Sequence, residues 1–152
     1  MIRHAAIADI PAAGKIINDC AEYGLMLHRS MAYLYEHLRD FHVAEEDGKI
    51  VGAAIYFFAY YTWVGKSLYL DDLYVKPDHR RRKVGSLLLR KVCELAAREG
   101  CRRVRWQVLG WNKDAISFYE SYGATISDEW LNCDLDEDGI VRFLNKDPVP
   151  GG

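Results

Sequence analysis

The spacing of apolar residues predicts two amphipathic helices within the first hundred residues. Apolar side chains recur every three or four positions from Ile10 to Cys20 and again from Leu87 to Ala97. This is the period of an α-helix with one buried face. Asp9 can cap the first of these helices, and Gly100 is suited to close the second.

Runs rich in β-branched and aromatic residues predict strands between these helices. Residues 41–45 and 50–61 should form an antiparallel hairpin, because the intervening Asp47-Gly48 favours a tight turn. Residues 67–75 should add a third antiparallel strand. Residues 103–108 follow a helical crossover and should therefore run parallel to that third strand. Two neighbouring strands that leave a common edge in this way can splay apart.

The remaining segments are predicted from shorter signals. The expected elements are a helix over 30–38 capped by Ser30, a helix over 113–122 stopped by Gly123, an edge strand over 125–135, and a short helix or strand over 137–144.

Composition indicates one globular domain with a full core. Half of the 152 residues are hydrophobic and 28% are charged, which favours a single domain over residues 1–146 followed by a flexible tail over 147–152. The net charge of -2 argues against a general nucleic-acid binder, although residues 76–105 are basic and residues 128–138 are acidic. No stretch approaches the ~20 apolar residues of a membrane span, so we expect a cytoplasmic protein.

The cysteines and histidines do not follow any metal-binding pattern. The four cysteines lack paired spacing, and the five histidines show neither HxxxH nor HExxH. We therefore expect no metal site and no disulfide.

An acidic strand followed by a cationic turn carries the candidate chemistry. Asp71 and Asp72 interrupt an otherwise apolar strand, and buried carboxylates are costly unless they have a function or a partner. Residues 80–86 then supply three arginines and a lysine before the next helix begins. Such a turn leaves backbone N–H groups at the helix N-terminus, where a phosphate or pyrophosphate can bind. Alone, an arginine run is more often a solvated turn; its place between strand and helix favours the anion site.

This turn resembles motif A of the GNAT superfamily of acyl-CoA-dependent N-acetyltransferases. The family's pyrophosphate loop has the pattern Gln/Arg-x-x-Gly-x-Gly/Ala, which Arg80 and Gly85 fit. Lys83 stands where the family has a glycine, so it either strains the backbone or adds a cation beside the phosphates.

A second stretch resembles motif B of the same family. Residues 108–119, followed by Tyr122-Gly123-Ala124, carry this likeness. Trp63-Val64-Gly65-Lys66, Leu70-Asp71-Asp72 and Trp111-Asn112 occur in the order typical of the diamine/spermidine N-acetyltransferase branch. The resemblance is strongest from Tyr56 to Ala124.

The resemblance implies the GNAT fold and acetyl-CoA as the cofactor, with CoA as a product. That fold is of the α/β (α+β) class, with a mixed, mostly antiparallel central sheet, splayed central strands and flanking helices. The residues that it places at the cofactor are Leu73, Tyr74, Val75, Arg80, Arg81, Arg82, Lys83, Val84, Gly85, Ser86, Asn112, Lys113, Asp114, Ala115 and Tyr119.

The same resemblance assigns roles in catalysis and amine binding. Asp71 matches the residue that removes a proton from the amine through water, and Tyr119 matches the general acid that protonates the leaving thiolate. Asp72 is expected to hold a cationic substrate group, because strand alternation would place it on the face opposite Asp71. Tyr23 and Trp63 are expected to line the substrate site.

The leading hypothesis is therefore acetyl transfer from acetyl-CoA to a primary amine of a small molecule, by direct attack in a ternary complex. The amine would be diamine-like or polyamine-like, in a homodimeric enzyme. An amino-acid N-acetyltransferase is the alternative within the class, with Arg29 as a candidate partner for the substrate carboxylate. An alternative from another functional class is that Lys83 impairs the loop. The protein would then be a catalytically poor acyl-CoA sensor or an interaction module.

Overall fold

The computed structural model of the protein describes residues 1–21, 40–129 and 131–145. The chain divides into two compact units, Met1–Gln107 and Val108–Gly152, which we call the first and second unit. The predicted helix over 30–38, the tail over 147–152, and the candidate residues Tyr23 and Arg29 lie outside the described residues.

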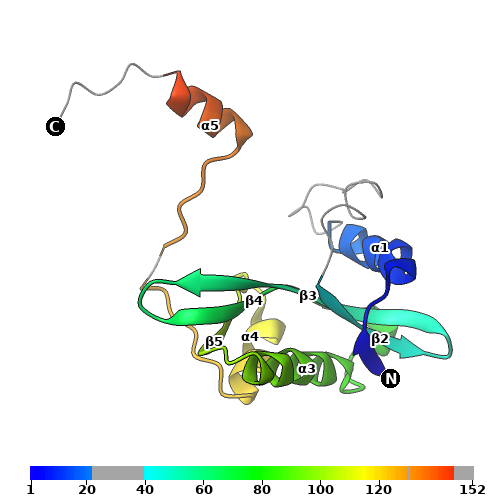
Figure 1. Ribbon diagram of the computed structural model, residues 1–152. Coiled ribbons are helices and arrows are strands. Elements are labelled where there is room, and N and C mark those ends of the chain that lie inside the picture. Colours follow the sequence, from blue (N-terminus) through cyan, green and yellow to red (C-terminus); the bar gives the residue numbers. More distant parts are fainter. Residues whose placement is uncertain (22–39, 130, 146–152) are drawn as a thin grey trace. The chain divides into compact units, whose positions relative to one another are not determined.

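The first unit is built on one mixed sheet (Figure 1). Neighbouring strands pair in sequence order, antiparallel from β1 to β4 and parallel between β4 and β5. The strands are β1 (Ile2–His4), β2 (Phe41–Glu46), β3 (Lys49–Tyr61), β4 (Gly65–Val75) and β5 (Arg103–Arg105). The predicted hairpin, the third antiparallel strand and the parallel crossover are confirmed. Sequence reasoning missed the three-residue β1 and extended β5 too far, to residue 108.

Two helices cover opposite faces of this sheet, α1 (Ile10–Ala21) above and α3 (Val84–Arg98) below in Figure 1. The apolar stripe of α1 contributes Ile10, Ala13 and Ile16 to a buried cluster with residues of β2 and β3. On the other face, Leu88 and Val92 of α3 are fully buried. The predicted amphipathic helices thus bury one stripe each, on either side of the same strands.

The β2–β3 turn has the chemistry that the sequence predicted. Asp47 and Gly48 both have positive φ, at 50° and 74°, as a two-residue hairpin turn matching the strand twist requires. The turn fixes the register that pairs Glu46 with Lys49.

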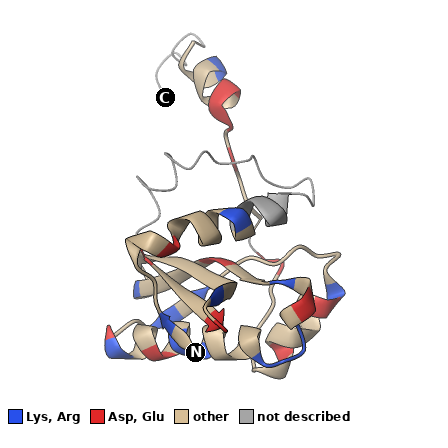
Figure 2. Cartoon of the chain, turned by 90° about the vertical axis from the view of Figure 1, so that its right-hand side faces the viewer, with Lys and Arg blue, Asp and Glu red and all other residues tan. Residues whose placement is uncertain are grey.

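The second unit contains two helices, α4 (Lys113–Ser121) and α5 (Glu137–Leu144). Asp136 caps α5 by accepting a hydrogen bond from the Gly139 N–H at 2.7 Å. Its first turn is acidic (Figure 2). This settles the open choice for residues 137–144 in favour of a helix.

The predicted edge strand over residues 125–135 is wrong for the positions that the structure describes. Residues 125–129 and 131–135 have no strand pairing, and Leu131 and Leu135 are 85% and 60% exposed. Leu131, Cys133 and Leu135 alternate with polar residues as in a strand, but all three are exposed, so this short alternation does not by itself produce strand pairing.

No helix in the described ranges is long and apolar enough to cross a membrane.

Gly52 provides a test of how closely β3, β4 and α3 pack. A Cβ at this position would lie 2.9 Å from the backbone oxygen of Tyr74 and 3.1 Å from Cδ1 of Leu88. We expect Gly52→Ala to lower the free energy of unfolding by about 1–3 kcal/mol, because the backbone of β4 cannot move aside cheaply. Urea denaturation would measure the loss. Gly110→Ala, where a Cβ meets nothing within 4 Å, is the matched control, and equal effects of the two changes would contradict the packing argument.

Candidate active site

A β-bulge in β4 lies at the centre of the candidate site. Ile55 pairs with Asp72 and Tyr56 pairs with Leu70, so Asp71 is an extra residue in β4. Paired residues share a face of the sheet, whereas Ile55 and Tyr56 point to opposite faces. Leu70 and Asp72 therefore lie on opposite faces although they are two residues apart. The strict alternation that was expected to separate Asp71 from Asp72 does not hold across this bulge.

The two carboxylates have perturbed acidity. Burial raises the pKa of Asp72 to about 6, and the negative charge of Asp71 contributes to the rise. Desolvation also raises the pKa of Asp71, although this side chain remains exposed to solvent. Burial and then the charge of Asp71 raise the pKa of Tyr69 as well. The charge of Asp71 therefore affects the acidity of both Asp72 and Tyr69.

The pairing between β4 and β5 ends just before the bulge. Only Ser67, Leu68 and Tyr69 pair with β5. Within the described strands, β4 from Leu70 to Val75 pairs only with β3. This confirms the predicted separation of the two strands. The candidate cofactor residues Leu73, Tyr74 and Val75 lie on that separated stretch.

The cationic turn before α3 has the backbone of an anion-binding loop. Arg81 and Lys83 both adopt left-handed conformations, with φ of 61° and 65°. Lys83 is the N-cap residue of the 15-residue α3. Left-handed residues next to a helix N-terminus form a concave arrangement of N–H groups, which the helix dipole makes favourable for a phosphate. The expected strain at Lys83 is thus present, and its side chain, like those of Arg81 and Arg82, is exposed.

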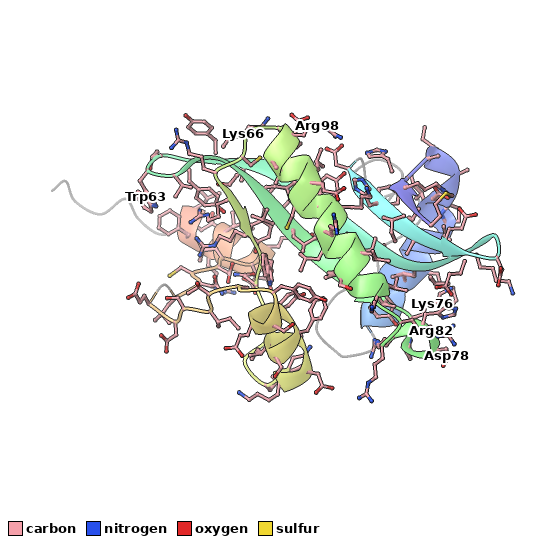
Figure 3. All side chains as sticks on the ribbon, turned by 90° about the horizontal axis from the view of Figure 1, so that it is seen from below. Trp63, Lys66, Lys76, Asp78, Arg82 and Arg98 are labelled. Carbon is pink, nitrogen blue, oxygen red and sulfur yellow. The ribbon has the colours of Figure 1, made fainter. Side chains whose placement is uncertain are left out.

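Arg80, the first arginine of the turn, contacts the end of β4. Arg80 Nε donates to the backbone oxygen of Val75 at 2.9 Å, and its guanidinium lies 5.6 Å from the Tyr74 ring centroid. This ties the loop to the end of β4. Arg82 lies at the N-terminal end of α3 with Lys76 and Asp78, and Lys66 and Arg98 mark the other end (Figure 3).

An acidic residue from the β2–β3 hairpin reaches this loop. Glu46 Oε2 lies 3.8 Å from Arg82 Nη1 and 3.7 Å from His79 Nε2. Both distances are long for an ion pair, and all three side chains are partly exposed, so the contacts hold the cations loosely.

The second unit positions the motif B residues. Asn112 Oδ1 accepts a hydrogen bond from the Ala115 N–H at 3.2 Å and caps α4, while Lys113 and Asp114 are exposed in the first turn. Tyr119 is 8% exposed and packs edge-to-face with Phe118 at 5.2 Å. Asn112 is therefore a structural cap whatever else it contacts.

The predicted site residues are divided between the two units. The first unit holds Asp71, Asp72, residues 73–75 and residues 80–86, and the second holds residues 112–115 and Tyr119. Trp63, the other predicted substrate residue, lies in the β3–β4 turn and is 76% exposed.

Sequence reasoning did not single out a group of aromatic and cationic residues on the Asp72 face of the sheet. Arg103 and Arg105 lie 4.4 Å and 5.9 Å from the Tyr61 ring centroid, and Phe57 stacks on Tyr69 at 5.0 Å. The available signal was the Arg-x-Arg spacing, which places both arginines on one face of a strand.

Comparison with known proteins assigns the chain to a family. Residues 13–124 match the Acetyltransferase (GNAT) family. The protein is a GNAT family member. An integron cassette protein from the mobile metagenome of V. cholerae has the same fold, with a TM-score of 0.82 at 21% identity over 96% of this chain and 98% of that one.

Two named relatives of this GNAT protein share more of its sequence. A thialysine N-epsilon-acetyltransferase from Sus scrofa is 45% identical over 100 residues, which are 64% of this chain and 59% of the relative. A spermidine/spermine N(1)-acetyltransferase-like protein 1 from Homo sapiens is 32% identical over 139 residues, covering 81% of this chain and 20% of that protein. The chain thus spans about three fifths of the thialysine enzyme's length.

The raised pKa of Asp72 predicts a stability that depends on pH. Folding raises this pKa from 3.8 to about 6, so the folded state binds the Asp72 proton more tightly than the unfolded state does. The resulting contribution to the free energy of unfolding is complete below pH ~4 and is lost as the pH rises through about 6. Asp72→Asn should therefore stabilise the protein at pH 8, by up to about 3 kcal/mol. The gain should shrink as the pH falls towards 4. Urea denaturation at pH 4.5, 6 and 8 would measure it, with the exposed Asp128→Asn as control; a variant less stable than wild type at pH 8 would refute the argument.

The left-handed backbone of Lys83 predicts a difference between two substitutions. A side chain with a Cβ costs about 1 kcal/mol in this conformation, so Lys83→Gly should be more stable than Lys83→Ala by about that amount. Both variants remove the cation and should weaken CoA binding equally. Thermal denaturation and calorimetric titration with CoA would separate the two effects. Equal stability of the variants would show that the backbone is not strained there.

Proposed function

We propose that this GNAT protein transfers an acetyl group from acetyl-CoA to a primary amine of a small molecule. The observation that carries this proposal is the pair of carboxylates at the β4 bulge. Asp71 and Asp72 both have raised pKa values, and they lie where the pairing of β4 with β5 has ended. Titratable groups perturbed in this way are typical of catalytic sites.

The carboxylates would prepare the amine for attack. A free alkylammonium has a pKa of about 10, so it must lose a proton before its nitrogen lone pair can react. Asp71 is exposed and can accept that proton through a water molecule, whereas Asp72 can hold the cationic group. Because Asp72 has a pKa of about 6, it is a stronger base than an ordinary carboxylate and can share the proton.

The loop before α3 fits the phosphates of CoA. Its two left-handed residues, the free N–H groups of the first helical turn and the exposed side chains of Arg81, Arg82 and Lys83 would bind a pyrophosphate. Leu73–Val75, which follow the part of β4 that pairs with β5, would align the pantetheine arm. Acetyl-CoA would supply the activated acetyl thioester.

Tyr119 is proposed to donate a proton to the departing sulfur. Its support is the spacing from Asn112 and its fixed position on α4, where it packs against Phe118. A buried phenol can keep its proton until a negative charge forms beside it.

The relatives name two kinds of amine, a lysine analogue and a polyamine. Both remain candidates, with transfer by direct attack in a ternary complex. A homodimer and a cytoplasmic location also remain predictions from sequence.

Release of free thiol from acetyl-CoA, measured with diamines, polyamines, lysine analogues and free amino acids, would test the proposal. Tyr119→Phe and Asp71→Asn should each lower kcat by about 100-fold or more with the preferred amine. Tyr122→Phe, which changes an exposed tyrosine just after the same helix, should have little effect. CoA binding without turnover of any amine would instead favour the acyl-CoA sensor.

The pH profile of the same assay would test Asp72. Wild-type kcat/KM should rise with pH through about 6, where Asp72 loses its proton, and this rise should disappear in Asp72→Asn. Survival of the rise in that variant would assign it to another group.

A further inference from the structure

Two consecutive glutamates at the end of β2 have different surroundings. Strand alternation points Glu45 and Glu46 to opposite faces of the sheet. Arg3 grips Glu45, donating to its Oε2 from Nε at 3.0 Å and from Nη2 at 2.8 Å. Glu46 instead reaches the cationic turn before α3, where its Oε2 lies 3.7 Å from His79 Nε2 and 3.8 Å from Arg82 Nη1. The first glutamate is thus fixed in an ion pair, whereas the second is shared between two groups.

The contact between Glu46 and Arg82 leaves the donors of the arginine available. An N–H···O hydrogen bond spans about 2.7–3.2 Å, which is well below the 3.8 Å between these side chains. Arg82, labelled in Figure 3, is 61% exposed, so a phosphate can reach its guanidinium. Glu46 therefore offsets part of the charge of Arg82 without occupying its N–H groups. Such a carboxylate competes with any other anion for the same cation.

His79 gives Glu46 a second partner. Its Nδ1 is buried and has no hydrogen-bond partner within the described residues. A proton on Nδ1 would be an unpaired buried donor, which is costly, so we place the imidazole proton on Nε2, facing Glu46. The His79 backbone N–H donates to the Lys76 oxygen at 2.9 Å, which fixes the residue in the short helical turn Pro77–His79. Glu46 can thus leave Arg82 and still have a donor beside it.

We propose that Glu46 is a counter-anion of the cationic turn, which leaves Arg82 when the pyrophosphate of CoA binds there. This inference rests on the CoA site proposed above and adds a control on its affinity. In the free protein, Glu46 offsets part of the repulsion among the consecutive cations of residues 80–83. After acetyl transfer, the same carboxylate competes with the phosphates of the CoA product. Glu46 therefore weakens the binding of acetyl-CoA and of CoA alike and favours release of the product.

A carboxylate beside a phosphate site could also strengthen binding, by fixing the cation in place beforehand. The distances decide between the two effects. A carboxylate at hydrogen-bond distance would hold the Arg82 side chain, whereas one 3.8 Å away and partly exposed leaves it free to move. The backbone of the turn has its own support, because Arg80 Nε donates to the Val75 oxygen at 2.9 Å. We therefore expect competition to outweigh any loss of order when Glu46 is neutralised.

Calorimetric titration with CoA tests this role. We expect Glu46→Gln to lower the Kd for CoA by about 3–10-fold, the scale of two exposed ion pairs. Asp47→Asn removes the same charge from the next position, where asparagine tolerates the left-handed φ of 50°. This matched control should change the Kd by less than about 2-fold, because solvent and salt screen a charge that has no contact with the turn. Pantetheine, which has the thiol arm of CoA without its phosphates, should bind both variants and the wild type equally.

A double-mutant cycle tests whether Glu46 acts through Arg82. In an Arg82→Gln background, Glu46→Gln should have little effect on the Kd, because the cation that Glu46 neutralises is gone. Glu46→Asp keeps the charge on a shorter side chain and should give an intermediate Kd; it also serves if Glu46→Gln does not fold. In steady-state assays, Glu46→Gln should lower the KM for acetyl-CoA and leave the KM for the amine unchanged. A general loss of structure would not produce that split.

The outcomes separate this inference from the proposed function. An unchanged or higher Kd in Glu46→Gln, or an equal gain in Asp47→Asn or in the Arg82→Gln background, would overturn the counter-anion role alone. CoA binding that responds to Glu46→Gln as expected, without turnover of any amine, would overturn the acetyl transfer and leave this role intact. A wild-type protein that does not bind CoA would overturn both.

Discussion

One extra residue in β4 determines how the chemistry of the first unit is arranged. Without it, Asp72 would lie on the face of Leu70, which is 1% exposed and part of the core. The bulge instead pairs Asp72 with Ile55 and moves it to the other face. There it shares a surface with Tyr69 and the two β5 arginines. The bulge thus decides which face of the sheet carries this carboxylate.

The site is unfavourable for stability in several places, and the surrounding core compensates. The carboxyl of Asp72 is partly desolvated, Arg81 and Lys83 hold left-handed backbones, and Arg103 has unpaired buried donors. Each of these costs about 1 kcal/mol or more in isolation. They surround a sheet whose central residues are fully buried between α1 and α3. Left-handed backbone and desolvated charge of this kind are often found at functional sites.

Local patterns predicted the regular parts of the fold well because each depends on nearby residues. The apolar stripe of α1 and the Asp47-Gly48 turn are both of this kind. The bulge was not predictable, since it depends on the register between β3 and β4 and not on the composition of either strand. The same register places Arg103 and Arg105 on the Asp72 face of the sheet. The predicted edge strand after α4 was wrong because the alternation at Leu131, Cys133 and Leu135 is a local signal, whereas a strand also needs a neighbouring strand to pair with.

The cationic turn shows why a lysine can replace the family glycine without destroying the loop. A concave anion site needs left-handed residues, and glycine supplies them without steric cost. Arg81 and Lys83 accept that cost and in return place two exposed cations beside the N-terminus of α3. Four consecutive cations would repel one another in the absence of a ligand. Glu46, at 3.8 Å from Arg82, and the Val75 carbonyl, at 2.9 Å from Arg80, relieve part of that repulsion. The loop is therefore held in a shape ready for an anion, with one loose carboxylate that a phosphate can replace.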